Sequence, residues 1–213
     1  MIHQVISPQE NGSNKNIAII IRETELVVPF DMKTDLTETL SNILIHDSSR
    51  NRLIVEDVVS EVNAGRKVLI LTERKAHIET LYQYLKNRFE VIRLSGDDAE
   101  SLRKTKFKQI AEGHFLVLIS TGQFLGEGAD IEKLDCLVLA YPFSFEGKLI
   151  QYIGRVQRGE ITPVIHDYRD KFVDYLEKMF LQRNRYYKKL VKSKEIKKFD
   201  ELSLIFNEDK VKY

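Results

Sequence analysis

Apolar runs separated by helical patterns dominate the chain from Lys67 onward. The runs of strand length lie at residues 68–71, 90–94, 115–119, 137–140 and 164–166. After the first of them, Ile78, Leu81 and Leu85 recur at the spacing of one helix face. Each connection between neighbouring runs is too long for a hairpin. The pattern therefore predicts an α/β fold in which a parallel sheet is sandwiched by helices.

The two ends of the chain differ from this regular part. Residues 1–16 are polar, and short strands are predicted at 18–22 and 26–28. Residues 169–190 carry apolar side chains at the spacing of a long helix, which by default packs onto the domain. We therefore expect three parts: an N-terminal extension or linker with short strands at 1–34, a main domain at 35–168 and a C-terminal helical extension at 169–213.

Two helix starts can be predicted from capping signals. One helix is expected from about Arg52, with Ser48 or Ser49 as the residue that caps it. Another is expected after Asp97, because Glu100 stands three residues further on and the pair resembles a capping box.

The charge balance restricts how a polyanion could be bound. Of the 213 residues, 43% are hydrophobic, so the chain can bury an ordinary core. Lys plus Arg number 33 against 32 for Asp plus Glu, which leaves a formal charge of +1. A polyanion must therefore be held by a local basic patch rather than by the field of the whole molecule.

Cysteine and histidine usage argues against disulfides and dedicated metal sites. Cys136 is the only cysteine, and in its apolar run a thiol is usually a small buried side chain rather than a catalytic group. The five histidines show no metal-ligand spacing, so no metal site is predicted. Nothing resembles a signal peptide or an apolar span of membrane length, so a cytoplasmic protein without membrane contact is expected.

A glycine-rich loop follows the apolar run that ends at Ile119. Residues 120–130 read Ser-Thr-Gly-Gln-Phe-Leu-Gly-Glu-Gly-Ala-Asp. Glycine lets backbone N–H groups approach an anion, and the carboxylate of Asp130 can accept hydrogen bonds from ribose hydroxyls. A tight turn with an acidic cap is the other interpretation, and the loop alone does not decide between them.

The stretch from Gln151 to Arg158 predicts an amphipathic helix with an arginine face. At about 100° per residue, Gln151, Arg155 and Arg158 point the same way, while Ile153 and Val156 fall on the opposite side. Arginine offers a planar fork that suits phosphate oxygens. The face therefore predicts a phosphate contact, with a solvated or salt-bridged surface as the alternative.

The order of these segments resembles the second, C-terminal RecA-like domain of superfamily 2 DEAD/DEAH-type helicases. Residues 151–158 match the motif VI pattern QxxGRxxR, residues 120–130 resemble motif V, and residues 68–74 stand where motif IV lies. The resemblance covers approximately residues 35–190. It is closer to bacterial helicases related to type III restriction and DNA repair helicases than to the RNA-acting DEAD-box group.

The resemblance implies a role for each matching position. Arg158 is implied to be the arginine finger that reaches the γ-phosphate of ATP, with Arg155 as its companion. Three positions are implied in nucleotide binding: Gln151, Gly128 and Asp130. Three are implied in contacts with the nucleic-acid strand: Thr121, Thr72 and Arg74. Two residues depart from the family pattern, since Gly122 stands where many relatives have Asp and Gln157 where close relatives often have His.

The sequence contains no GxxxxGK[ST] loop, which an ATP-driven helicase uses to hold phosphates. The resemblance therefore implies a RecA-like domain without a P-loop of its own. ATP and Mg²⁺ would be bound by an N-terminal RecA-like domain, in the same or a separate chain. We expect the isolated chain not to hydrolyse ATP, and the resemblance favours DNA over RNA as the nucleic acid.

Two other functions stay open at this point. The chain could be a non-catalytic helicase-like module that binds nucleic acid or protein, although such a module has no need of an arginine pair. It could also be a self-contained α/β enzyme that acts on a nucleotide. Near the C-terminus, lysines between 188 and 198 with Tyr186 and Tyr187 form either a basic, aromatic patch or a solvated helix end.

Overall fold

The computed structural model describes residues 2–6, 17–29, 37–122, 131, 134–156 and 161–192. Its strands are β1 (Ile2–Ile6), β2 (Ile17–Glu23), β3 (Val68–Thr72), β4 (Val91–Leu94), β5 (Val117–Thr121), β6 (Cys136–Leu139) and β7 (Val164–Arg169). Its helices are α1 (Thr37–His46), α2 (Ser48–Asn63), α3 (Lys75–Leu85), α4 (Glu100–Ala111), α5 (Glu146–Val156) and α6 (Asp174–Lys192). None of these helices is both long enough and apolar enough to cross a membrane.

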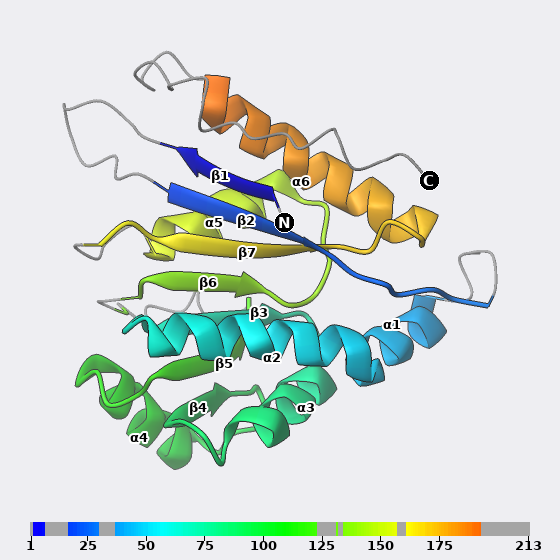
Figure 1. Cartoon of the computed structure of the whole chain (residues 1–213). Coiled ribbons are helices and arrows are strands. Elements are labelled where there is room, and N and C mark those ends of the chain that lie inside the picture. The colour runs from blue at the N-terminus through cyan, green and yellow to red at the C-terminus, as the bar shows by residue number, and fades with distance from the viewer. Residues whose placement is uncertain are drawn as a thin grey trace.

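The strands form one seven-stranded sheet in the order β1-β2-β7-β6-β3-β5-β4. The six strands from β2 to β4 in this order run parallel, and β1 runs antiparallel to β2 at the edge. Alternate side chains of each strand pack on opposite faces. In β3, Val68 and Ile70 join the core under α2 and α3, whereas Leu69 and Leu71 join the core under α4, α5 and α6. Figure 1 shows α2 in front of the sheet and α5 and α6 behind it, so the predicted α/β sandwich is confirmed.

The sheet extends beyond the main domain that the sequence suggested. β2 pairs in parallel with β7, and its Ile19 and Ile21 share a core with Phe180 and Tyr187 of α6. Residues 17–23 and 174–192 therefore belong to the same layers as the segment at 35–168. Residues 26–28 are not a strand, because Leu26 packs against α1 and the start of α6 instead.

Both predictions of helix starts from capping signals need correction. α2 begins at Ser48, one turn earlier than predicted, because the Asp47 carboxylate caps it by accepting a hydrogen bond of 2.7 Å from the Arg50 backbone N–H. α4 begins at Glu100 without a side-chain cap. The Asp97 carboxylate instead pairs with the Lys75 ammonium group.

A buried arginine of α2 connects one helical layer to the strand ends. Arg50 is 2% exposed. Its Nε donates to Asp170 Oδ1 at 2.9 Å, directly after β7, and its Nη1 donates to the carbonyl oxygen of Ala140 at 2.7 Å, directly after β6. The guanidinium group thus joins α2 to the segment that leads from β6 to α5.

A second buried arginine makes the equivalent connection from the opposite layer. Arg183 of α6 donates two hydrogen bonds, of 2.9 and 2.8 Å, to the carboxylate of Asp167 in β7. It also donates to the carbonyl oxygen of Phe143, while the Tyr187 hydroxyl donates to Asp167 at 2.9 Å. Fixing α6 to the sheet in this way makes it an integral layer of the fold.

Candidate functional site

The segments predicted to carry chemistry meet at the edge of the sheet that the carboxyl ends of its parallel strands form. β3 and β5 are parallel neighbours whose last residues, Thr72 and Thr121, are in register. Glu73 and Gly122 follow them directly, and α5 comes after β6 on the same side. Ligands of open α/β sheets bind at the carboxyl ends of the strands. This edge is therefore the candidate functional site.

Helix α5 buries the apolar face that its sequence predicts. Leu149, Ile153 and Val156 lie in the core, Gln151 is exposed, and Arg155 is partly exposed. Arg158 lies outside the described residues. The described part of α5 thus presents the predicted polar face away from the sheet.

Tyr152 of α5 fills the space next to Gly122. A Cβ atom added to Gly122 would lie 1.6 Å from the Tyr152 hydroxyl oxygen and 2.6 Å from its Cζ. Both distances are too short for any real side chain. Gly122 is therefore matched to a tyrosine inside the QxxGRxxR stretch, and the chain packs directly against α5 at this glycine.

Glu73, immediately after β3, completes this contact. The Lys148 Nζ lies 3.0 Å from Glu73 Oε2, and the Tyr152 hydroxyl donates to Glu73 Oε1 at 3.4 Å. Burial, and next the negative charge of Glu73, raise the pKa of Tyr152, so its hydroxyl stays protonated and acts as a donor. We call Glu73, Gly122, Lys148 and Tyr152 the edge cluster. It joins the segments that follow β3 and β5 to helix α5.

Sequence reasoning missed three members of the edge cluster as functional candidates. Tyr152 stands within the QxxGRxxR stretch, but at a position that its periodicity assigns to the core. Lys148 stands one turn before it, and the position of Glu73 directly after a buried strand was the only signal for that residue. The departure at Gly122 was the one clue that a bulky neighbour occupies this space.

Thr72 faces the interior rather than the surface. It is 1% exposed, and its hydroxyl lies 3.0 Å from His77 Nδ1 and accepts a hydrogen bond of 3.3 Å from the Arg74 backbone N–H. His77 Nε2 in turn lies 3.0 Å from Asn51 Oδ1. Burial, then the charge of Arg50, lower the pKa of His77 to about 3, so the ring is neutral. In this conformation the Thr72 hydroxyl is buried and engaged by His77 and the Arg74 backbone.

The other two predicted strand-contact residues lie nearer the surface. Thr121 is partly exposed at the end of β5. Arg74 is exposed, and its Nε donates to Ser41 Oγ at 2.9 Å, while its guanidinium lies 5.7 Å from the ring centre of Tyr141. Gly128 and Asp130 lie outside the described residues.

Comparison with known proteins identifies a protein family that includes the residues of this site. The model of the helicase conserved C-terminal domain matches residues 48–160. The chain belongs to this family. Membership of this family confirms the predicted resemblance of the chain to superfamily 2 helicases. The matched residues include β3, the sequence that follows β5, and α5.

Two of the relatives are named as helicases, one from a virus and one from a phage. A putative ATP-dependent RNA helicase of Acanthamoeba polyphaga mimivirus is 29% identical over 165 residues, which covers 74% of this chain and 30% of the relative. A probable helicase, D10, of Escherichia phage T5 is 28% identical over 174 residues, covering 78% of this chain and 34% of the relative. The chain thus spans about a third of the length of these relatives.

A solved structure supports the fold. The structure of T4 UvsW superposes with a TM-score of 0.61 at 17% sequence identity, over 76% of this chain and 36% of that one. At this identity the similarity concerns the fold alone, which is that of a RecA-like helicase domain.

Proposed function

We propose that this chain supplies the second RecA-like domain of an ATP-dependent helicase or translocase that acts on nucleic acid. The observation that carries the proposal is the packing of α5 at the strand ends. Tyr152 locks this helix against Gly122, and the polar face with Gln151 and Arg155 points away from the sheet. Membership of the helicase C-terminal family supports the same role.

The nucleotide of such an enzyme would be bound mainly by another domain. This chain's sequence has no P-loop, and its contribution is an arginine face, which suits phosphate oxygens approached from outside. We propose that Arg158 and Arg155 neutralise charge on the transferred phosphoryl group of ATP·Mg²⁺, while Gln151, Gly128 and Asp130 meet the nucleotide. ATP and Mg²⁺ supply the phosphoryl-transfer chemistry when the N-terminal RecA-like domain holds them.

Nucleic acid would be bound at the neighbouring strand ends. Thr121, which is partly exposed, and Arg74, which is exposed, are the described residues whose positions fit a backbone contact. Arg74 already contacts the Ser41 hydroxyl and the Tyr141 ring, so we assign it two roles. It positions these two side chains, and it contacts the nucleic-acid backbone. We propose DNA as the substrate, following the resemblance of the motifs.

The proposal can be tested in the complete enzyme, assembled from this chain and an N-terminal RecA-like domain. Arg158→Ala and Arg155→Ala should each reduce ATP turnover strongly, and loss of an arginine finger lowers the rate by about 10³- to 10⁵-fold. Nucleic-acid affinity should change little. The matched control is Arg185→Ala, which removes an exposed arginine of α6 and should leave turnover unchanged.

Three results would contradict the assignments. Mg²⁺-dependent ATP turnover by the isolated chain, abolished by Arg158→Ala, would show that the chain contains a whole active site. Loss of nucleic-acid binding with unchanged ATP turnover in Arg158→Ala would reject the finger assignment. Stimulation of the complete enzyme by RNA and not by DNA of the same sequence would reject DNA as the substrate.

A further inference from the structure

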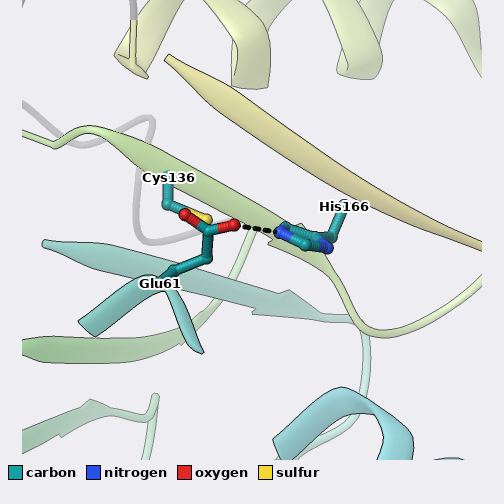
Figure 2. A group of neighbouring side chains, drawn as sticks. All are labelled: Glu61, Cys136 and His166. Atoms are coloured by element: carbon teal, nitrogen blue, oxygen red, sulfur yellow. Dashed lines mark hydrogen bonds and ion pairs between the residues drawn. The ribbon is translucent and has the colours of Figure 1, made fainter. Parts of the chain in front are cut away.

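Three side chains with metal-binding donors meet on the sheet face under α2, away from the candidate functional site. They are Glu61 of α2, Cys136 of β6 and His166 of β7, and one ligand atom from each lies within 4.8 Å of the others. Figure 2 shows the Glu61 carboxylate between the thiol of Cys136 and the ring of His166. All three are buried, with exposures of 8%, 0% and 3% respectively.

The fold brings these donors together from distant parts of the chain. β6 and β7 are parallel neighbours in which Cys136 pairs with Val164 and Val138 with His166. Cys136 and His166 therefore point to the same sheet face, two register positions apart, and the last turn of α2 places Glu61 above them. No spacing rule along the sequence could have found this group.

The surroundings of the group resemble the outer shell of a metal site. Metal-bound imidazoles usually direct their second nitrogen at a carboxylate, which orients the ring. Here His166 Nε2 lies 2.8 Å from Glu61 Oε1, and on the other side of the ring Nδ1 lies 3.6 Å from Asp57 Oδ2. Glu61 Oε2 is held separately by Arg66 Nη1 at 3.0 Å. His166 Nε2 and Glu61 Oε1 thus face each other at hydrogen-bonding distance, and a cation would take the place of the proton between them, while Asp57 and Arg66 hold the outer atoms of the two groups.

One buried atom of this group also lacks a hydrogen bond. His166 Nδ1 is buried and has no hydrogen-bond partner within the part of the chain that the structure describes. A buried polar atom of this kind is uncommon and needs an explanation. A cation on Nε2 would strengthen the attraction between the Nδ1 proton and Asp57 and draw the two together.

We propose that Glu61, Cys136 and His166 form a binding site for one divalent transition-metal ion of the zinc class. Thiolate, imidazole and carboxylate are the donors that Zn²⁺ prefers, and the thiolate disfavours Mg²⁺ and Ca²⁺. In a tetrahedral shell the ligand atoms lie about 3–4 Å apart, so side-chain shifts of roughly 1 Å complete the site. A water molecule is the fourth ligand. The proposal does not depend on the helicase role.

The protonation state of the thiol adds a specific expectation. Burial, and next the negative charge of Glu61, hold the pKa of Cys136 well above its usual range, so without metal the thiol is protonated. Binding of the cation must displace this proton and also the proton between His166 Nε2 and Glu61 Oε1, because the ligands are a thiolate and an imidazole nitrogen that carries no proton.

Cobalt provides a direct test on the full chain, because Cys136 is its only cysteine. Titration of the reduced protein with Co²⁺ should produce a thiolate-to-cobalt charge-transfer band that saturates at one ion per chain. Zn²⁺ should displace Co²⁺ and abolish the band, with a Kd below about 10 μM, which corresponds to roughly −7 kcal/mol. Any thiolate band from a monomeric chain must come from Cys136.

Variants locate the ion. Cys136→Ser should abolish the band, and His166→Gln should weaken Zn²⁺ binding by at least about 100-fold. Asp57→Asn, which touches no metal directly, should weaken it by about 10- to 100-fold. The control is His114→Gln, because the His114 side chain is 71% exposed and lies away from the three donors. The affinity of this variant for Zn²⁺ should equal that of the original chain.

The result for the unaltered chain decides the proposal even if a buried variant fails to fold. If Zn²⁺ at 100 μM neither binds nor displaces Co²⁺, or if Co²⁺ binds without a thiolate band, the proposal is overturned. The group is then a buried histidine–carboxylate ion pair beside an inert thiol. Equal affinity of the original chain and a folded His166→Gln variant would overturn it as well.

Discussion

The arginines of this protein work in two regions that differ in exposure and in their partners. Arg50 and Arg183 are each 2% exposed, and each bonds a carboxylate of the β7 end and a backbone carbonyl. Arg155, at the strand-end edge, is partly exposed on α5. Arg50 and Arg183 hold the fold from inside, whereas Arg155 lies where we propose that another domain meets this chain. Loss of the first kind should therefore cost stability, and loss of the second should cost activity.

The largest effect is expected from Arg183→Met. Removing the guanidinium leaves the Asp167 carboxylate, which is 0% exposed, with Tyr187 as its described partner. Breaking a buried ion pair in this way costs about 3–5 kcal/mol. Urea denaturation should show this loss in the free energy of unfolding. Arg185→Met on the exposed side of the same helix should change it by less than about 0.5 kcal/mol. Similar losses in the free energy of unfolding for the two variants would contradict the distinction between arginines of the interior and arginines of the edge.

Gly122→Ala should have the next largest effect. The added methyl group overlaps the Tyr152 hydroxyl, and overpacking of this kind costs about 1–3 kcal/mol. The control is Gly154→Ala within α5, where a Cβ meets nothing within 4 Å and alanine should be neutral or stabilise the helix by up to about 1 kcal/mol.

A double variant tests whether Tyr152 is the cause. Combined with Tyr152→Ala, Gly122→Ala should lose most of its separate cost, because the space is then empty. Additive losses in denaturation experiments would show that the two residues do not touch, and that Gly122 is not held against α5.

The interior should also show a sensitivity to acid. The pKa of His77 is about 3 in the fold and about 6.5 in an unfolded chain. Between these values the unfolded chain binds a proton that the folded protein does not. The contribution of His77 to stability is therefore full above about pH 6.5 and falls with decreasing pH toward 3, by about 1.4 kcal/mol per pH unit well below 6.5.

His77→Gln keeps hydrogen-bonding groups but removes the titration. Denaturation between pH 4.5 and 7.5 should show a pH dependence that is flatter by this amount in the variant. His114→Gln, which alters an exposed histidine, should keep the slope of the original protein. Equal slopes in all three proteins would show that His77 is not the source.

The smallest effect is expected from Lys148→Met at the edge. The side chains of Lys148 and Glu73 are 42% and 30% exposed, and pairs of this kind contribute about 0.2–1 kcal/mol. The loss should shrink further in 0.5 M salt, because exposed charges are screened. A loss comparable to that of Arg183→Met would place the edge cluster with the interior instead.

Much of the sheet could be predicted because its strands are continuous apolar runs. The runs near 68–71, 115–119, 137–140 and 164–166 all became strands of the parallel sheet. The place of β2 could not be predicted, because its partner β7 lies far along the chain and pairing depends on tertiary contacts. Capping signals failed near Asp97 because a lysine of another helix attracts that carboxylate.

The candidate site was predictable in part. Helical periodicity placed Gln151 and Arg155 on the polar side of α5, as the structure has them. It could not reveal that Tyr152 contacts Gly122, because that contact joins two elements that are separate in sequence. Nor could it show that the Thr72 hydroxyl turns inward to His77, since a threonine at a strand end can point to either side.

The segment between β6 and α5 has a mechanical consequence. Arg50 holds the carbonyl of Ala140 from one layer, and Arg183 holds the carbonyl of Phe143 from the other, three residues before α5 begins. A load applied to α5 by a neighbouring domain is therefore shared by both layers of the sandwich. We expect this domain to turn as a stiff body under such a load, with the bending confined to chain outside its sheet.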